Sequence, residues 1–220
     1  MRTLWLSHPL SEQTPLYGGS GGIEIRPDKS ISKGDSCNTT RLSFPGHAGT
    51  HVDTPRHFRA DGKNLDDFQP EEWIFNAPRV VTVEAGPGTL IGAERLAGSG
   101  SLDNAADLLI IRTGFERFRA EPLYWQNSPG LEPGLADYLS NRLPSLRAIG
   151  IDFISISSLS HRQTGREAHR TLLGKDFLLF EDMALARLDK AGKLKRVIAL
   201  PLRVAASDGV PCTIIGSIEE

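Results

Sequence analysis

Three histidines and an aspartate recur at odd positions within residues 45–58. They are His47, His51, Asp53 and His57. Imidazole nitrogen and carboxylate oxygen are ligands that suit zinc, manganese and iron(II), and His47, His51 and Asp53 alone would supply three of them. This segment is therefore the candidate reactive centre.

A strand is the backbone that best explains this spacing. Proline and glycine at positions 45, 46, 49 and 55 disfavour a helix, whereas Thr50 and Val52 favour extended structure. Side chains of a strand alternate between its two faces, so the histidines and Asp53 would share one face while Val52 and Phe58 would point to the other. We expect a strand that runs into a loop, with Gly49 leaving room for an ion or a substrate.

The alternative is a polar face that binds no ion. A single histidine is more often a surface residue or a hydrogen-bonded core residue than a ligand. Four candidate ligands on one face favour the metal site. The pattern Gly-x-Ser-x-Gly occurs only in the glycine cluster at 18–22, which is expected to be a loop with no helix directly after it, and this argues against serine-based hydrolysis.

Composition favours a globular protein that acts on small molecules. The chain has 220 residues, of which 39% are apolar, enough for one substantial core. Its formal net charge of −2 gives no electrostatic reason to expect nucleic acid or an anionic membrane as a partner. No run of about 18 apolar residues occurs, so we expect a cytoplasmic protein with a small-molecule substrate. Cys37 and Cys212 are too few and too far apart to suggest a disulfide framework.

Apolar runs rich in β-branched residues predict buried strands at 79–83, 108–112, 149–156, 177–180 and 197–200. Helical patterns lie between several of them, at 132–143 and 91–96. This alternation predicts an α/β or mixed α+β fold, with residues 1–220 forming one compact domain.

His169 is a candidate for the second half of the site. It precedes the predicted strand 177–180, which ends on Glu181 and Asp182. Ligands bind beyond the carboxyl ends of strands in open α/β sheets, so a carboxylate there can be functional. Taken alone, however, this spacing favours the interpretation that Glu181 and Asp182 solvate the strand end or begin a helix.

The run from His47 to Phe58, His-x-Gly-Thr-His-x-Asp-x-Pro-x-His-Phe, resembles the signature of the metal-dependent "cyclase" family, which includes bacterial kynurenine formamidase and isatin hydrolase. The likeness extends over most of the chain. Residues 4–11 resemble the opening strand of that family, residues 150–152 its central strand and residues 208–211 its C-terminal turn. The resemblance implies a single domain with the swivelling β/β/α fold.

The resemblance also implies a set of roles. His47, His51 and Asp53 would bind one metal ion, and Asp53 would bridge to a second ion held by His169 and Glu181. The ions would be zinc or manganese, one or two per subunit, and the protein would be a homo-oligomer, either a dimer or a tetramer. His57 corresponds to the catalytic histidine, which acts as a general acid and base.

Two positions concern the substrate. Tyr17 stands where the formamidases have a tryptophan that contacts an aromatic substrate, so we expect Tyr17 to bind substrate. Because this position holds tyrosine rather than tryptophan, the resemblance gives weaker support for N-formylkynurenine as the substrate. Arg162 and Arg166 lie in a polar segment before His169. A bidentate contact with a substrate carboxylate is one interpretation of these arginines, and a solvated loop is the one we favour from the sequence.

The expected activity is hydrolysis of the carbon–nitrogen bond of a small aromatic N-acyl or cyclic amide by metal-activated water, as in an arylformamidase. Imidazole gains and loses a proton near neutral pH, which suits His57 to proton transfer. Alternatives are a hydrolase of isatin, cyclic imides or lactones, and a catalytically silent metal-dependent binding protein. A His-His-Asp metal oxygenase is a third alternative, but His169 and Glu181 would fill the positions that oxygen needs.

Overall fold

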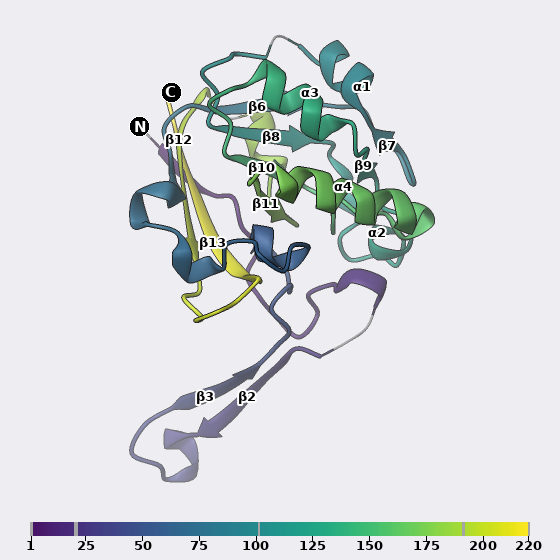
Figure 1. Ribbon diagram of the computed structural model, residues 1–220. Coiled ribbons are helices and arrows are strands. Elements are labelled where there is room, and N and C mark those ends of the chain that lie inside the picture. Colours follow the sequence, from purple (N-terminus) through teal and green to yellow (C-terminus); the bar gives the residue numbers. More distant parts are fainter. Residues whose placement is uncertain (1, 20–21, 101, 191, 220) are drawn as a thin grey trace.

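The computed structural model describes residues 2–19, 22–100, 102–190 and 192–219 (Figure 1). The largest sheet in this part of the chain has nine strands. Its strands are β1 (Arg2–Trp5), β4 (His51–Asp53), β5 (Ile74–Phe75), β6 (Pro78–Thr82), β8 (Leu108–Arg112), β10 (Ala148–Ile151), β11 (Leu178–Glu181), β12 (Leu194–Pro201) and β13 (Gly209–Ile218). They are ordered β5-β12-β13-β4-β11-β10-β8-β6, with β1 also paired to β13. Strand β6 lies against β12, so the sheet curls until its two ends approach each other.

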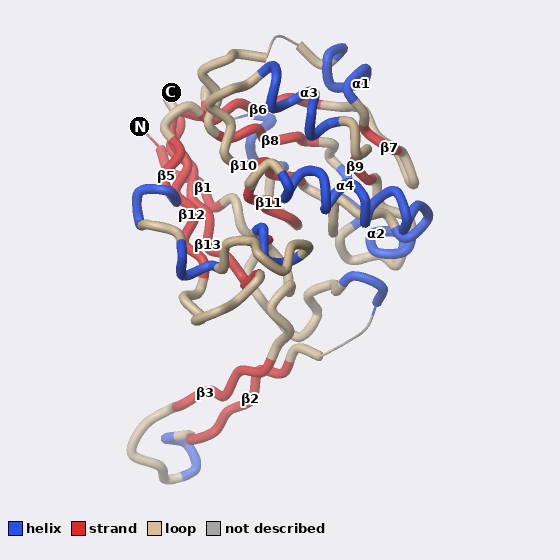
Figure 2. The backbone as a smooth tube through the Cα atoms, in the orientation of Figure 1, coloured by secondary structure: helices blue, strands red, loops and turns tan. Residues whose placement is uncertain are grey.

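The sheet has a parallel half and an antiparallel half. Strands β6, β8, β10 and β11 run parallel, whereas β4, β13, β12, β5 and β1 pair antiparallel with their neighbours. Three helices, α1 (Ala93–Gly98), α3 (Leu135–Arg142) and α4 (Arg162–Gly174), cover the outer face of the parallel half (Figure 2). A fourth, α2 (Leu123–Gln126), lies near them. The expected mixed α/β class is confirmed.

The core lies on both faces of the parallel strands because their side chains alternate. Leu109, Ile111 and Ile149 face the helices, whereas Leu108 and Ile110 face the antiparallel strands. All five are buried, and each such side chain contributes about 1.5 to 3 kcal/mol relative to an exposed position. Runs that are apolar at every position, as predicted for 108–112, follow from this burial on two sides.

Most of the predicted elements are present, with shifted ends. The predicted strand 149–156 ends at Ile151, because the Asp152 carboxylate turns away to accept hydrogen bonds from the backbone N–H groups of Thr113 and Gly114. The predicted helices 132–143 and 91–96 are α3 and α1. Residues 208–211 were expected to form a turn, but residues 209–211 are the first three of β13 and pair with β4.

Helix α4 was not predicted. Its segment was interpreted as a solvated loop, and this interpretation is wrong: residues 162–174 form the longest helix in the described part of the chain. The helix has few apolar residues, and only a narrow stripe including Ala168, Leu172 and Leu173 is buried. Gly165 permits close packing, since a Cβ atom there would overlap Ser157.

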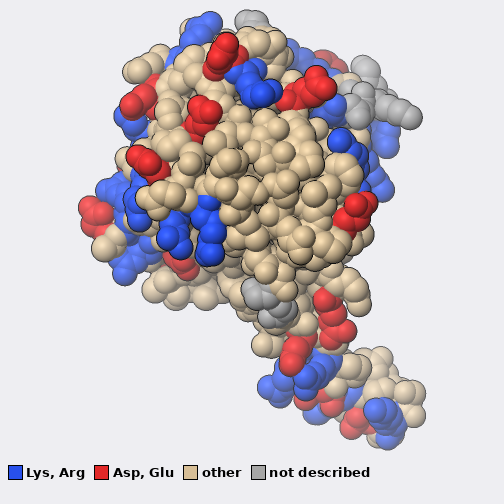
Figure 3. Space-filling model, turned by 90° about the vertical axis from the view of Figure 1, so that its right-hand side faces the viewer, with Lys and Arg blue, Asp and Glu red and all other residues tan. Residues whose placement is uncertain are grey.

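A hairpin of β2 (Glu24–Lys29) and β3 (Thr39–Ser43) stands off from the body of the molecule (Figures 1 and 3). A small apolar cluster at its base, centred on Leu16, Ile23 and Ala48, anchors it. Basic and acidic side chains are interspersed along it, in pairs such as Arg26 with Glu24. A second short pair is β7 (Leu90–Ile91) with β9 (Gly130–Leu131).

Short 3-10 helices connect several of these elements. They include Tyr17–Gly19 and Pro55–His57 near the predicted site, and Ile31–Lys33, Leu65–Asp67, Pro70–Trp73, Phe115–Phe118, Leu159–His161 and Ala186–Lys190 elsewhere. None of the described helices has both the length and the apolar character needed to cross a membrane. Cys37 and Cys212 are both free.

Candidate metal centre

Strand β4 places His51 and Asp53 in the middle of the sheet. It pairs with β11 on one side and β13 on the other, so that His51 lies opposite both Glu181 and Pro211. Residues two apart on a strand share a face, and both side chains are buried on the same side of the sheet while Val52 packs into the core on the other. This part of the predicted strand is confirmed.

Strand β11 and helix α4 supply the other half. Glu181 is the last residue of β11, and its register with β4 sets its carboxylate beside the His51 ring. His169 lies on the buried stripe of α4, which packs against the same edge of the sheet. The interpretation of Glu181 and Asp182 as residues that solvate a strand end is wrong, because both are buried.

We call His51, Asp53, His169 and Glu181 the inner group. Four contacts close it into a ring, in which each carboxylate uses different oxygens for the two histidines. They are His51 Nε2–Asp53 Oδ1 at 3.3 Å, His51 Nε2–Glu181 Oε2 at 3.4 Å, His169 Nε2–Glu181 Oε1 at 3.5 Å and His169 Nε2–Asp53 Oδ2 at 3.6 Å. Four donors bound tetrahedrally at about 2.0 to 2.1 Å lie about 3.3 to 3.4 Å from one another, so this spacing fits a divalent ion.

Backbone carbonyls orient the two inner histidines. The Nδ1–H of His51 donates to the Gly49 carbonyl at 2.8 Å, and that of His169 donates to the Gly165 carbonyl at 2.9 Å. A carbonyl only accepts, so Nδ1 carries the proton and the Nε2 lone pair of each neutral ring faces the carboxylates. This is the tautomer that a metal ion requires of both rings.

Glu181 is held from the opposite side. Its Oε1 accepts hydrogen bonds from the Ile156 N–H at 2.7 Å and from the Ser155 hydroxyl at 3.1 Å. These groups belong to the segment that leaves the sheet after β10, so the departure from the predicted strand serves the site directly. In metal sites, hydrogen-bond donors such as these hold the ligating carboxylate in its orientation.

The charges of the inner group oppose the effect of burial. Burial acts to lower the pKa of His51 and His169, but contact with Asp53 and Glu181 prevails, raising the pKa of His51 well above its usual value and that of His169 to about 10. Burial acts to raise the pKa of Asp53, whereas His169, His47 and His51 hold it well below its usual value. Burial and Asp53 act to raise the pKa of Glu181, but His169 and His51 lower it. The metal-free protein thus carries protons on buried histidines, where a bound ion would compete with them.

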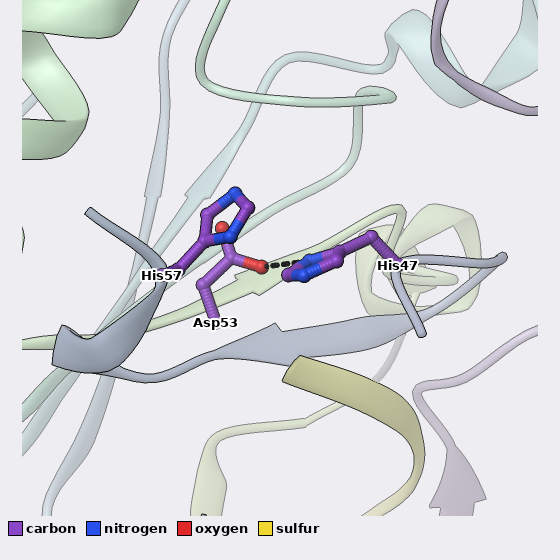
Figure 4. A group of neighbouring side chains, drawn as sticks. All are labelled: His47, Asp53 and His57. Carbon is purple, nitrogen blue, oxygen red and sulfur yellow. Dashed lines mark hydrogen bonds and ion pairs between the residues drawn. The ribbon is translucent and has the colours of Figure 1, made fainter. Parts of the chain in front are cut away.

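A second cluster, the outer group, consists of His47, His57 and Asp208 and touches Asp53 (Figure 4). His47 Nδ1–H donates to Asp53 Oδ1 at 2.7 Å, and His47 Nε2 lies 3.1 Å from Asp208 Oδ2. His57 Nδ1 lies 2.8 Å from the same Asp208 oxygen. The two imidazole rings are 4.0 Å apart between centroids, so one carboxylate serves both.

The expected single pleated face does not extend to the outer group. Gly49 has a φ of 62°, a left-handed conformation that ends any strand and explains this glycine better than room for a ligand does. His47 therefore lies on a loop before the strand, and His57 lies on the 3-10 helix Pro55–His57 after it. The chain reverses around β4, and this reversal brings both rings back to Asp53.

The geometry groups the candidate ligands differently from the family resemblance. The resemblance places His47 with His51 and Asp53, whereas the two sets of donors within 4.8 Å of one another are His51, Asp53 and Glu181, and His47, Asp53 and His57. His169 completes the first set through its contacts with both carboxylates. Asp53 belongs to both sets, which is the bridging position that the resemblance implies.

Asp208 is the residue that sequence reasoning missed. It directly precedes β13, which places it opposite the end of β4. Burial acts to raise the pKa of Asp208, but His57 and His47 lower it, so it remains a carboxylate. The next residue, Gly209, has no Cβ because the His47 ring packs against its backbone. The available signal was an acidic residue followed by glycine at a chain reversal. Nothing in the sequence links Asp208 to His57, which lies 151 positions earlier.

The inner group and the two histidines of the outer group line a cavity of about 270 Å³. Tyr17, Phe58 and Ile154 provide its less polar walls, and Arg162 and Arg166 line it from α4. Phe58 was expected to point away from the site; this is wrong, since its ring stacks on His169 at 4.6 Å and 16°. Tyr17 is at the cavity as expected, with its hydroxyl 3.4 Å from the Ser157 hydroxyl.

Asp182 lies next to Glu181 but has a structural role. It forms an ion pair with Arg119 at 2.7 Å and accepts a hydrogen bond from the Tyr124 hydroxyl at 2.6 Å. Its backbone carbonyl accepts a hydrogen bond from Thr50, next to β4. Asp182 therefore ties the end of β11 to the loops around the site.

A family model described as "Putative cyclase" matches residues 4–158, well over half of the chain. The chain belongs to the Cyclase family. The matched region contains His47, His51, Asp53 and His57, while the other residues of the two groups follow it in the sequence. A buried cluster of histidine, aspartate and glutamate with the spacing of a metal site is thus present in a cyclase-family chain.

Similar proteins cover the chain almost completely. A kynurenine formamidase of Bacillus cereus is 27% identical over an alignment of 212 positions, and the match covers 94% of this chain and 92% of that protein. A kynurenine formamidase of Geobacillus thermodenitrificans is 28% identical over 207 residues, with 94% and 92% covered. The structure of isatin hydrolase A from Labrenzia aggregata, bound to benzyl benzoate, has a TM-score of 0.82 at 21% identity and covers 100% of this chain and 94% of that one. This structural likeness shows that the fold is shared, and it confirms the expected cyclase-like fold.

Proposed function

We propose that this chain is a metal-dependent hydrolase that cleaves the carbon–nitrogen amide bond of a small aromatic N-acyl or cyclic amide, as an arylformamidase does. The inner group carries the proposal: four buried donors at mutual distances of 3.3 to 3.6 Å, with both imidazoles held in the tautomer that ligation requires. The relatives named kynurenine formamidase support this class of reaction.

His51, Asp53, His169 and Glu181 would hold one zinc or manganese ion, and His47, Asp53 and His57 offer donors for a second. When bound, such an ion supplies Lewis acidity and a water molecule whose pKa is brought to about 7. Ser155 and the Ile156 N–H keep the Glu181 carboxylate in place for this purpose.

His57 moves the proton. Its Nδ1–H donates to Asp208, which leaves Nε2 of the neutral ring as the basic nitrogen at the cavity. His57 accepts a proton from the attacking water and returns it to the nitrogen that leaves. The negative charge of Asp208 stabilises the imidazolium formed between these steps. The His57 ring keeps its orientation because its Nδ1–H stays hydrogen-bonded to Asp208 in both steps.

The walls of the cavity position the substrate. Phe58 and Ile154 offer apolar surface in the cavity, and Tyr17, which lines the same cavity, is a residue that we propose contacts an aromatic ring. The volume of about 270 Å³ lies just below the usual range for ligand pockets, roughly 300 to 1,000 Å³, which suits a substrate with one ring.

Opening of a cyclic amide, imide or lactone is the second candidate. The fold shared with isatin hydrolase A favours it, and the chemistry at the reacting carbonyl is the same. The two candidates differ in whether the leaving group remains attached to the product. A dimer or tetramer, as the resemblance implies, is a further proposal that sedimentation equilibrium tests.

Purified protein loaded with zinc or manganese tests the function. We expect about one or two ions per chain by elemental analysis, and turnover of N-formylkynurenine, formanilide or isatin that a chelator abolishes and the metal restores. Bound metal without turnover of any of these would support a binding protein instead. Dioxygen consumption would support an oxygenase. Turnover that survives complete metal removal would overturn the proposal.

A further inference from the structure

Arg162 and Arg166 lie on one side of α4 together with His169. Positions four and seven residues apart fall on one face of a helix, so the two arginines form a row that ends at the inner group. At a rise of about 1.5 Å per residue, Arg166 is about 4.5 Å and Arg162 about 10.5 Å from His169 along the helix axis. Both line the cavity.

Neither arginine is neutralised by the protein. Among the described residues, no ion pair or hydrogen bond involves the side chain of Arg162 or Arg166. The carboxylates that line the cavity are Asp53 and Glu181, and both already contact histidines. By contrast, Arg119 has Asp182 as its partner, and Arg79 has Asp103.

We propose that Arg162 and Arg166 form an anion subsite that selects amide substrates bearing a carboxylate. This inference rests on the proposed function. The substrate would place its scissile carbonyl at the inner group, its ring against Phe58 and its carboxylate at the guanidinium groups. Planar guanidinium binds carboxylate through two parallel hydrogen bonds, which gives orientation as well as affinity.

The size of the cavity suits one ring. Phe58 and Ile154 line it together with the histidines, the carboxylates and the two arginines, and the Phe58 ring stacks on His169. A ring that bears both an N-acyl group and a carboxylate would have a partner among the polar, the apolar and the cationic groups of this lining. An uncharged amide would leave the row of guanidinium groups without a counter-charge.

Two amides that differ only in charge test the subsite. The probes are 4-formamidobenzoate and formanilide, and the measured quantity is the ratio of their kcat/KM values. In the double variant Arg162→Gln/Arg166→Gln we expect this ratio to fall by about 10- to 100-fold, the effect of charge-assisted hydrogen bonds. Arg166→Lys keeps the positive charge but not the paired N–H donors of guanidinium, so it should retain part of the preference for 4-formamidobenzoate. Arg170→Gln, an exposed arginine of the same helix outside the cavity, is the matched control and should leave the ratio unchanged.

Binding of benzoate to the protein, measured by calorimetry, gives a second result that does not depend on turnover. We expect its Kd to rise about tenfold or more in the double variant but not in Arg170→Gln. If the wild type hydrolyses neither amide but binds benzoate through the arginines, the subsite stands and the proposed reaction fails. If both amides are hydrolysed and the double variant leaves their ratio and the Kd of benzoate unchanged, the subsite is overturned and the proposed reaction stands.

Discussion

The inner and outer groups share Asp53 but differ in burial and in how they are held. The side chains of the inner group are at most 5% exposed, and backbone groups orient three of the four. His47, His57 and Asp208 are 28%, 27% and 47% exposed and orient mainly one another. A rigid, dry cluster suits a fixed ion, whereas a group in contact with solvent can exchange protons with it. The difference indicates that the inner group holds the ion and the outer group transfers protons. The following substitutions test this distinction.

The largest effect should follow from a change in the inner group. In Glu181→Gln we expect metal affinity to fall by more than about 100-fold, because even partners outside the ligand set contribute 10- to 100-fold. The metal-free variant should also lose about 3 to 5 kcal/mol of unfolding free energy, since buried protonated histidines lose a counter-charge. Elemental analysis and urea unfolding measure the two effects. Glu71→Gln, at an exposed glutamate, is the control; equal loss in both variants would contradict a special role for Glu181.

A change in the outer group should spare the metal but not the reaction. We expect His57→Gln to lower kcat by about 10²- to 10⁴-fold, the usual contribution of a general acid or base. The variant should retain the ion of the inner group, because that group is intact. His161→Gln, at an exposed histidine on a 3-10 helix, is the matched control. Loss of the inner metal from His57→Gln would erase the distinction between the groups.

Asp208 should show a smaller effect of the same kind. Asp208→Asn preserves the shape of the side chain but removes the charge that orients His57, so we expect kcat to fall by about 10- to 100-fold. Combined with His57→Gln, it should add little, because Asp208 acts through that ring. A steady-state double-mutant cycle measures this. Fully additive losses would show that Asp208 acts by another route, for example through His47 alone.

The most gradual effect is that of pH on the inner group. The pKa of His169 is about 10 in the folded metal-free protein, against a usual value of 6.5. Its proton therefore contributes stability that is complete below pH 6.5 and is lost as the pH rises through 10. Metal affinity should change in the opposite direction, rising by up to about tenfold per pH unit for each proton released. Thermal melts of the metal-free protein measure its stability across this pH range, and chelator competition measures its metal affinity. If stability and metal affinity changed in the same direction with pH, competition between protons and metal would be contradicted.

Local order in the sequence accounts for much of the fold. Apolar runs such as 108–112 are buried on both faces of a parallel sheet, and continuous hydrophobicity is what that environment demands. Helix α4 escaped prediction because its buried stripe is narrow and includes His169 and Gly165, which carry no hydrophobic signal. Strand β4 has only three residues, so the predicted alternation of faces holds for His51, Val52 and Asp53 but not for His47 or His57.

The sequence by itself determined the chemistry of the site: the types and spacing of His47, His51 and Asp53 predict metal ligands, and the resemblance of this motif to the family adds His169 and Glu181 as ligands and His57 as the catalytic histidine. Only the tertiary structure decided which of them meet. A strand flanked by two others brings Glu181 and Asp208 to opposite ends of β4, and a left-handed glycine turns His47 back onto Asp53. The pairings of β4 with β11 and β13 join residues more than 100 positions apart, and they depend on sheet register rather than on any local preference of the chain.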